Sequence, residues 1–590
     1  MKSFKSKYII LPAFAAFTVG FYACKKTFLD KPPVGTYQQS TLANAAGVKG
    51  LLIGAYSLLD GQGGAGGSWQ SASDNWVYGG VVSDDAHKGS DPGDQADILS
   101  LEQYKTNPSN SFLDPKWAWA YDGVQRANEV LRTMRVVTDL KGLDTTVAGA
   151  EARFLRGHYH FEVKRMFNMV PYIDESVTYN AKNFNVPNSA DIWPNIEADF
   201  QYAVANLPAT QPQVGRANKY AAEAYLAKVY MYEHKYAEAK PLFDDVIANG
   251  TNTAGTKYAL VPKFHDNFDA ATKNNSETVF AAQMSVNDGS GAANANAGDV
   301  LNFPYTSQYP VSCCGFYQPS YSLVNAYKTT AEGLPDVDHY NDVDIKNDYG
   351  VKDADAFTPY AGTLDPRLDW TAGRRGIPFL DWGVMIGFSA VRNQASGGPY
   401  LPIKNAAWKS QTGTLTDNSS WTAGYTAINY NIIRFADVLL MAAEAEVEIG
   451  SLDVAESYVN MVRNRAANPD GMVHTYVDPN DPTKGFTTTP AANYLINPYP
   501  AGYFAGQGQA SARTLVQFER RLELGMEGHR FFDLVRYGAA DQVLNAYIAH
   551  EVKSGYSLLN GSQFTKGKNE YFPIPQAEID LSHGVLKQNQ

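Results

Sequence analysis

Acids, arginines and a histidine are crowded into one stretch near the C-terminus, 519-ERRLELGMEGHRFFDLVRYG-538, which holds four acids and four arginines. A glycoside hydrolase could draw its two carboxyls from such a stretch, and one of them would need a raised pKa. The equal numbers of acids and arginines favour another interpretation, the paired charges of a packed helix. The expected pairs, three positions apart, are Arg520 with Glu523, Glu527 with Arg530, and Arg530 with Asp533. We therefore predict a structural role for this stretch.

Motifs of common catalytic centres are missing from the sequence. It has no H-E-x-x-H zinc motif, no Walker phosphate loop and no dinucleotide fingerprint. His158 and His160 would lie about 200° apart on a helix, so they cannot share a metal ion. Hydrolysis by two carboxylates stays open as an alternative, because 61 acids give no means of choosing a pair.

Four aspartates have part of the spacing of a calcium-binding loop: Asp342, Asp344, Asp348 and Asp353. Lys346 and Asn347 stand where that loop needs a ligand and a turn glycine. We predict a solvated acidic loop and no metal or cofactor, with a structural calcium ion as an open alternative.

The N-terminus has the features of an export signal. Three lysines lie in MKSFKSKY, and an apolar run from Ile9 to Ala23 precedes Cys24. Such a run is too short to remain as a membrane-spanning helix. A cysteine at the cleavage point is the residue that bacterial lipoproteins acylate, so we predict a signal peptide over 1–23 and lipid attachment at Cys24. An ordinary signal followed by a chance cysteine is the alternative.

Charge and cysteine content narrow the classes of partner. The formal net charge is −12, and the sequence pI is about 5.4. This balance argues against a nucleic-acid partner, which needs a basic face. The other two cysteines, Cys313 and Cys314, are adjacent, and we expect free thiols there because neighbouring residues rarely reach the Cα spacing of a disulfide, with an unusual local redox state as the alternative.

Helical periodicity predicts a mainly α protein. Helices are expected over 41–60, 116–137 and 144–169, the last of them stopped by Pro171. Two helix pairs with tetratricopeptide-like spacing follow at 216–250 and 432–467. Such pairs bury their apolar faces only when several of them stack, so they form a scaffold.

The rest of the chain is irregular. A glycine loop, 61-GQGGAGGSWQ-70, follows the first helix, and a polar loop is expected over 83–94. Residues 251–430 are rich in glycine, asparagine, proline and aromatic residues, with few periodic runs. This composition predicts functional loops with few short strands, carried by the helical scaffold.

Several stretches resemble the SusD/RagB-like outer-membrane lipoproteins of Bacteroidetes, which are nutrient-binding partners of SusC-like TonB-dependent transporters. In chain order they are CKKTFLDKPP at 24, VVSDDAHKG at 81, EARFLRGHYHFEVKRMFNMVPYIDE at 151, GRANKYAAEAYLAKVYMYEHKYAEA at 215, NNSETVFAAQ at 274, DPRLDWT at 365, GPYLPIKN at 398, NIIRFADVLLMAAEAEVEIG at 431, ERRLELGMEGHRFFDLVRYG at 519 and YFPIPQAEI at 571. Each is weak alone, but their number and order are specific.

The resemblance implies a SusD-like fold of tetratricopeptide-like helix pairs against an irregular part. The expected parts are 24–250, and 251–590 with the insertion 251–430 and returning helices 431–590, all in one integrated unit. It also implies a non-catalytic role at the cell outer membrane. The protein would be lipid-anchored and surface-exposed, would bind a glycan and would pass it to a SusC-like transporter.

Sugar binding uses aromatic faces beside carboxylates, amides and arginines, so aromatic residues in loops are the candidates. By the family's pattern these are Trp69, Trp76, Tyr78, Asp84 and Asp85 in the first region, and Tyr309, Tyr317, Trp382 and Trp421 in the second. Trp76 and Tyr78 lie in an apolar run that is also typical of a core. Trp117 and Trp119, at the start of a helix, are assigned to packing.

Two other functions remain open from the residues. The first is a surface glycoside hydrolase. The second is a protein that binds peptides or another nutrient, because tetratricopeptide pairs commonly bind proteins.

Overall fold

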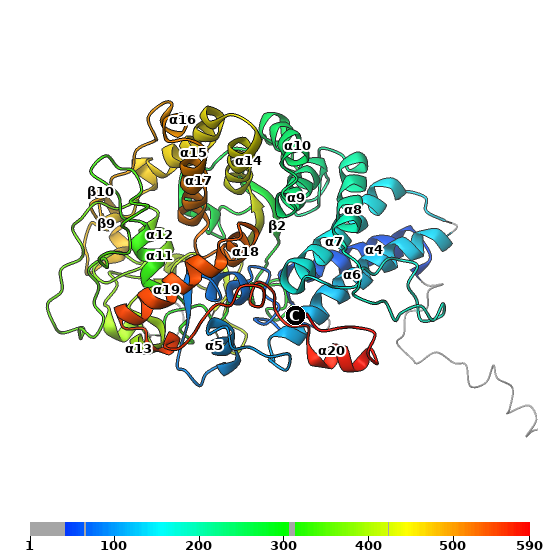
Figure 1. Cartoon of the computed structure of the whole chain (residues 1–590), viewed down its shortest axis with the longest axis horizontal. Coiled ribbons are helices and arrows are strands. Elements are labelled where there is room, and N and C mark those ends of the chain that lie inside the picture. The colour runs from blue at the N-terminus through cyan, green and yellow to red at the C-terminus, as the bar shows by residue number, and fades with distance from the viewer. Residues whose placement is uncertain (1–41, 64–65, 138, 306–312, 423, 590) are drawn as a thin grey trace, which may run out of the picture.

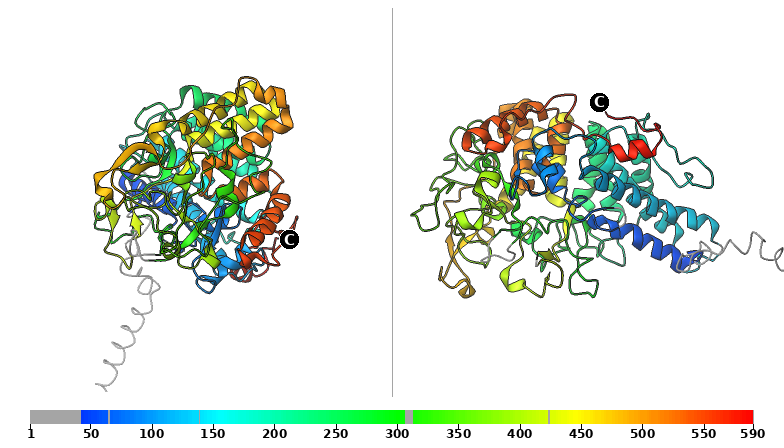
Figure 2. Two further views of the ribbon diagram at one scale, coloured as in Figure 1. Left: turned by 90° about the vertical axis from the view of Figure 1, so that its left-hand side faces the viewer. Right: turned by 90° about the horizontal axis from the view of Figure 1, so that it is seen from below.

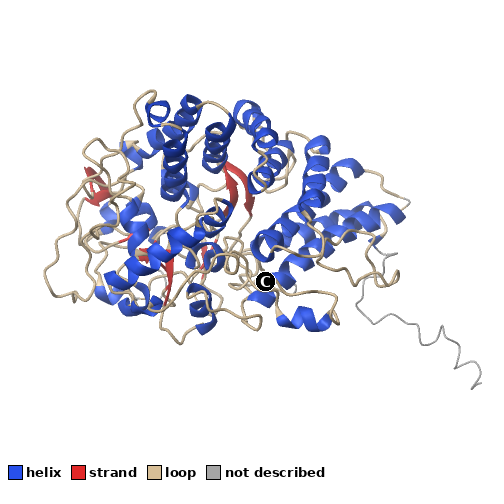
Figure 3. Ribbon diagram, in the orientation of Figure 1, coloured by secondary structure: helices blue, strands red, loops and turns tan. Residues whose placement is uncertain are grey.

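The computed structural model describes residues 42–63, 66–137, 139–305, 313–422 and 424–589. The predicted signal peptide, Cys24 and Tyr309 lie outside these residues. The predicted mainly α fold is confirmed, since helices dominate and the strands are few and short (Figure 3). None of the described helices is both long enough and apolar enough to cross a membrane.

The helices form a curved layer along one side of the molecule (Figure 1). Each packs against its neighbours in the order α4, α6, α7, α8, α9, α10, α14, α15 and α17. Their bounds are Ala45–Tyr56 (α4), Leu113–Val136 (α6), Thr145–Phe167 (α7), Trp193–Asn206 (α8), Lys219–Tyr232 (α9), Tyr236–Asn249 (α10), Phe435–Ile449 (α14), Leu452–Ala466 (α15) and Gln509–Leu524 (α17). The helix pairs predicted at 216–250 and 432–467 are α9–α10 and α14–α15.

Side-chain caps explain where several of these helices begin. The side chain of Asn44 accepts a hydrogen bond from the Gly47 amide, and Asp144 caps α7 through the amides of Thr146 and Val147. Asn218 and Ser451 cap α9 and α15 in the same way. Each cap satisfies backbone N–H groups that have no partner within the helix.

The irregular part lies beside the helical layer, as the second view of Figure 2 shows. It contains only two-stranded antiparallel sheets among the described residues. Strand β2 (Thr278–Ala282) pairs with β8 (Tyr430–Arg434), so the two ends of the 251–430 insertion meet and β8 leads directly into α14. The insertion therefore leaves the scaffold and returns to it at one place.

Strand β1 (Ala86–Gly89) corrects the loop predicted over 83–94. It is buried along its length and pairs with β3 (Phe316–Pro319). Polar residues are tolerated there because they have partners: His87 Nε2 lies 2.8 Å from Glu551 Oε2, and Lys88 Nζ donates to the carbonyl oxygens of Asp91 and Asp94.

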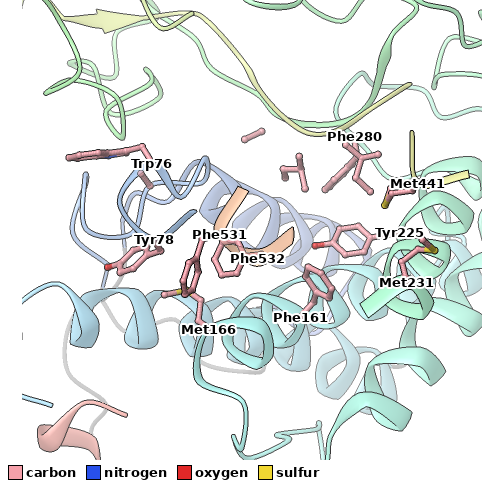
Figure 4. Packing of buried hydrophobic residues seen from close by; sticks show 14 of the residues in the cluster. Trp76, Tyr78, Phe161, Met166, Tyr225, Met231, Phe280, Met441, Phe531 and Phe532 are labelled. Carbon is pink, nitrogen blue, oxygen red and sulfur yellow. The ribbon is translucent and has the colours of Figure 1, made fainter. Parts of the chain in front are cut away.

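One large cluster of buried apolar side chains extends from Val48 to Leu586. Figure 4 shows part of it, where Trp76 and Tyr78 lie near Phe531 and Phe532. Trp117 and Trp119 are also buried in this cluster, which confirms their assignment to packing. The N-terminal segment and the C-terminal helices thus share one core.

The charged stretch 519–538 spans the end of α17 and the helix α18 (Arg530–Arg536), and its ion pairs are not the predicted ones. Glu523 accepts hydrogen bonds from Arg367, Arg434 and Arg465 of other segments. Arg520 pairs with Asp437 at 2.7 Å and with Asp533 at 3.1 Å. The three local pairs were wrong because the helix is interrupted at Gly525–His529 and tertiary partners lie closer.

The expectation of free thiols at Cys313 and Cys314 is also wrong. Their sulfur atoms are joined as a disulfide across a cis peptide bond, with the two Cα atoms 3.1 Å apart.

Candidate ligand-binding surface

Three of the predicted aromatic residues lie inside the protein. Trp76, Tyr78 and Tyr317 are each at most 1% exposed. The indole N–H of Trp76 donates to the Gly298 carbonyl at 3.1 Å, and the Tyr78 hydroxyl donates to the Phe112 carbonyl at 2.6 Å. The prediction that these rings face a ligand is wrong in this structure, because each fills the core where an apolar segment packs.

Asp84 and Asp85 are likewise buried, and arginines hold them. Arg530 Nε donates to Asp84 Oδ1 at 2.7 Å, and Arg521 lies 3.0 Å from the same carboxylate. Burial alone would raise the pKa of Asp84, but these two guanidinium groups lower it to about 2. Asp85 accepts a hydrogen bond from the Met526 amide, and burial raises its pKa to about 7. Both residues join the N-terminal segment to the C-terminal helices and do not face a ligand.

Trp382 occupies a separate apolar cluster within the insertion, together with Trp370 and Trp408. It is partly buried, and its indole N–H donates to the Ala407 carbonyl at 2.9 Å. Lys409 Nζ lies 5.8 Å from its ring centre. The structure therefore does not bring Trp382 together with the other exposed candidates.

Trp421 is the most exposed of the described candidates, at 58%. It lies in the connection between β6 (Thr416–Asp417) and β7 (Tyr425–Thr426), which pair as a hairpin. Its indole N–H donates to the Tyr425 hydroxyl oxygen at 2.8 Å. A hairpin with a tethered indole presents an aromatic face to solvent in a defined direction.

Trp69 meets Trp421 from the glycine loop after α4. The two ring centres are 6.4 Å apart, edge to face, with an angle of 71° between the rings. Gly61 begins this loop at φ +84°, where a Cβ would lie 2.4 Å from the Ser71 carbonyl oxygen, so only glycine fits. The Ser71 hydroxyl donates back to the Gly61 carbonyl at 2.6 Å and closes the loop.

A third segment holds the two loops in place. The side-chain amide of Asn287 donates to three backbone carbonyls at the base of the hairpin. The backbone N–H of Asn296 donates to the Thr426 carbonyl at 2.9 Å. On the other side, the Gln62 side chain donates to the carbonyls of Ala293 and Ala295. The loop over 285–303 thus connects the segments that carry Trp69 and Trp421.

A pocket of about 470 Å³ opens between α4 and the same loops. Its polar side chains include Asp60, Gln62, Arg126, Gln213, Gln283 and Asn294. The segment after α4 lines the pocket and leads into the loop that carries Trp69. The loop over 285–303 also lines the pocket, and it bonds to the hairpin that carries Trp421. Amides and guanidinium groups of this kind bind hydroxyl groups, whereas the face of an exposed tryptophan ring can pack on the C–H groups of a sugar.

Asp60 is the single acid among the residues that line this pocket. It accepts a hydrogen bond from the Gln62 amide at 2.6 Å. Burial raises its pKa to about 7, although Arg126 opposes this shift. A hydrolase of the two-carboxylate type needs a second carboxyl about 5 to 10 Å away, and no second acid lines the described pocket.

Most of this pocket could not be found from the sequence. Gln213 and Gln283 belong to unremarkable polar stretches, and only the position of Asp60 before a glycine loop was a signal.

The four aspartates with part of the spacing of a calcium-binding loop are not gathered around a common centre. Asp344 lies 3.0 Å from His550, and Asp342 lies 3.0 Å from His339. No group of three metal-ligating side chains is found within the described residues.

The fold consists of stacked helix pairs, and loops beside them carry the aromatic residues of the candidate surface. These features define a helical scaffold protein of the tetratricopeptide-like type. The model of the SusD family matches residues 276–590, and a second model, described as starch-binding associating with outer membrane, matches residues 66–231. The chain belongs to the SusD family. Neither matching model describes an enzyme.

Known proteins resemble the chain over most of its length. The SusD-like protein P2 of Formosa agariphila is 24% identical over 511 residues, covering 84% of this chain and 86% of that protein. A laminarin binding SusD-like protein has a TM-score of 0.63 and 23% identity, covering 92% of this chain and 99% of that one. Surface glycan-binding protein A from Bacteroides thetaiotaomicron, in complex with laminarihexaose, has a TM-score of 0.61 and 20% identity, with the same coverage. These structures share the fold.

Proposed function

We propose that this protein binds a glycan at the cell surface through Trp69 and Trp421 and passes it to a SusC-like outer-membrane transporter. The observation that carries the proposal is the meeting of these two indoles from distant loops, with Trp421 mostly exposed. A large exposed indole held by a hydrogen bond leaves apolar surface in contact with water in the free protein. A sugar ring that packs on the indole would cover this surface.

The adjoining pocket supports the same function. Its amides and arginines offer hydrogen bonds to sugar hydroxyls, and the loop over 285–303 that lines it also holds the hairpin of Trp421. Family membership supports it further, because two structures of the same fold are described as binding laminarin or laminarihexaose. The lone carboxyl of Asp60 favours binding without cleavage.

The anchor and the transporter rest on the sequence and the family. A lipid on Cys24 would hold the chain at the outer membrane, which agrees with the family description of association with that membrane. Mass spectrometry of the mature N-terminus tests the lipid, and a start elsewhere without lipid would exclude it. Co-purification with a SusC-like transporter from the same cells tests the partner.

Affinity gels and calorimetry with laminarin, starch, xylan and galactomannan test the binding site. We expect one of these polysaccharides to bind and the Trp69→Ala and Trp421→Ala variants to weaken binding at least about tenfold, since aromatic pairs and stacking contribute on the order of 1 kcal/mol or more each. Tyr179→Ala is the matched control. Tyr179 is 83% exposed and belongs to another exposed aromatic pair, in which its ring centre lies 5.2 Å from the ring centre of Phe184.

Unchanged binding in both tryptophan variants would exclude this surface as the site. Product analysis runs on the same samples, and turnover of any bound glycan would exclude a purely binding role.

A further inference from the structure

A second pocket of about 260 Å³ lies in the irregular part of the chain, where six short stretches of the chain converge. They include the turn around His265, the helix α12 (Leu368–Thr371), and the strands β9 (His474–Tyr476) and β10 (Phe486–Pro490). Neither Trp69 nor Trp421 lines it, and it shares no lining residue with the pocket beside them.

Aromatic rings form much of its wall. His265 stacks on Trp370 with ring centres 4.4 Å apart and an angle of 16°. Trp408 lies 6.4 Å from Trp370 and 6.3 Å from Phe486, nearly perpendicular to the latter. Phe486 is 38% exposed. The rings thus run from a buried end at His265 to a solvent-exposed end at Phe486.

The polar groups of this wall have few partners in the protein. Both ring nitrogens of His265 and the indole nitrogen of Trp408 are buried without a hydrogen-bond partner in the described part of the chain. The side chains of Asp266 and His474 are half-buried and that of Asp470 is exposed, and none of the three makes a hydrogen bond or ion pair with the described residues. A buried polar group without a partner costs on the order of 1 to 3 kcal/mol.

Buried charged groups and buried neutral groups of this protein differ in how often they have a partner. Buried charges elsewhere are paired repeatedly; Glu523 alone accepts from Arg367 at 2.9 Å and from Arg434 at 2.5 Å. Other buried neutral groups of the described residues also lack a partner, among them the indole nitrogen of Trp69 and the hydroxyl of Tyr317, so what distinguishes the second pocket is that three such nitrogens lie together on its aromatic wall. Groups left free beside aromatic rings are what a polar ligand with apolar faces would satisfy.

Charge narrows the kind of ligand. Three acids line the pocket, Asp266, Asp269 and Asp470, against the one lysine Lys263. Burial lowers the pKa of His265 to about 4, so its ring is neutral near pH 7. An acidic wall disfavours sulfated sugars and uronic acids and leaves hydrogen-bond acceptors for neutral hydroxyls.

We propose that this pocket is a second saccharide site, which binds the end of a neutral oligosaccharide; the inference rests on the proposed glycan-binding function. Its volume is slightly below the range of about 300 to 1,000 Å³ usual for drug-sized ligands, which suits one or two sugar rings. The rings of Trp408 and Phe486 pack on the sugar faces, and Asp266 and Asp470 accept hydrogen bonds from its hydroxyls.

Titrations of neutral hexasaccharides of the laminari, cello, malto, xylo and manno series into a Trp69→Ala/Trp421→Ala protein test the site. This double variant lacks the first surface, so binding that remains reports on the second. We expect at least one hexasaccharide to bind with a stoichiometry of one. Adding Asp266→Asn and Asp470→Asn, which keep the side-chain shape, then lowers the affinity about tenfold or more.

Trp408→Ala in the same background is a stronger variant, and circular dichroism checks that it folds. The aspartate variants keep the test valid if it does not. The proposal is overturned if the double variant binds none of the hexasaccharides, or if the aspartate substitutions leave its affinity unchanged. Failure of the first surface would be seen separately, as polysaccharide binding whose affinity and stoichiometry are both unchanged by the loss of Trp69 and Trp421.

Discussion

Arg434 and Glu523 form a buried ion pair between the insertion and the C-terminal helices, with Nη1 of the arginine 2.5 Å from Oε1 of the carboxylate. Arg434 ends the strand β8, and Glu523 lies near the end of α17. Both side chains are at most 1% exposed. The pair joins the returning end of the irregular part to the helical scaffold.

Replacing Glu523 with glutamine should lower the free energy of unfolding by about 3 kcal/mol, because it leaves the guanidinium groups of Arg434 and Arg367 buried with less compensating charge. Urea denaturation measures this change. Glu448→Gln is the matched control, since Glu448 pairs with Arg513 at the surface and should cost less than about 1 kcal/mol. Glycan affinity should be unchanged, and a loss of affinity with normal stability would reopen a catalytic role for the stretch 519–538.

His87 predicts a stability change in mildly alkaline solution. Burial alone would lower its pKa, but the hydrogen bonds that its ring N–H groups donate to the carboxylates of Glu102 and Glu551 outweigh burial and raise the pKa to about 9. A histidine with a raised folded pKa stabilises the protein fully below its unfolded value of about 6.5, and this contribution is lost as pH rises through 9. The free energy of unfolding should therefore fall by about 3 kcal/mol between these limits.

Denaturant melts from pH 6 to 9.5 measure this slope. His550, which also pairs with Glu551 and has a pKa raised to about 9, contributes in the same direction. His87→Gln should flatten the slope, whereas His339→Gln, at an exposed position, should not. An unchanged slope in His87→Gln would contradict the assignment.

Gly528 should be intolerant of substitution. It has φ +72°, and a Cβ there would lie 1.6 Å from the Asp74 carbonyl oxygen. Gly538 has a similar φ of +67° with no neighbouring atom within 4 Å of its Cβ position. Gly538→Ala should thus cost about 1 kcal/mol from the backbone alone, and Gly528→Ala at least about 3 kcal/mol more. Thermal melts compare the two variants, and equal losses of stability would contradict the close approach of the segments around Gly528 and Asp74.

Tyr425→Phe should weaken glycan binding without reducing stability by more than about 1 kcal/mol. The substitution removes the hydroxyl that accepts the indole N–H of Trp421, so the exposed ring loses its fixed direction. We expect the affinity to fall about fivefold, which calorimetry with the bound polysaccharide measures. A larger loss than in Trp421→Ala would show that Tyr425 acts on the ligand by itself.

Helix pairs were predictable because their signal is local. The periodicity of residues 216–250 and 432–467 places apolar side chains on one face, and the observed helices lie within these bounds. The helices α8 and α19 (Ala540–Ser554) were not predicted, although they are regular in the structure. It was harder to predict which aromatic residues are exposed, because Trp76 is buried and Trp421 is exposed although both are tryptophans.

The family and the helical scaffold could be inferred from the amino-acid sequence, since they depend on periodicity and on motifs that lie within one segment. Which tryptophans face solvent and which arginines hold Glu523 could be learned only from the folded chain. Burial and ion pairing depend on segments that are distant in the chain and meet after folding. Trp69 is thus proposed as a site residue because its ring packs against that of Trp421, and the acids of 519–538 are structural because arginines of other elements surround them.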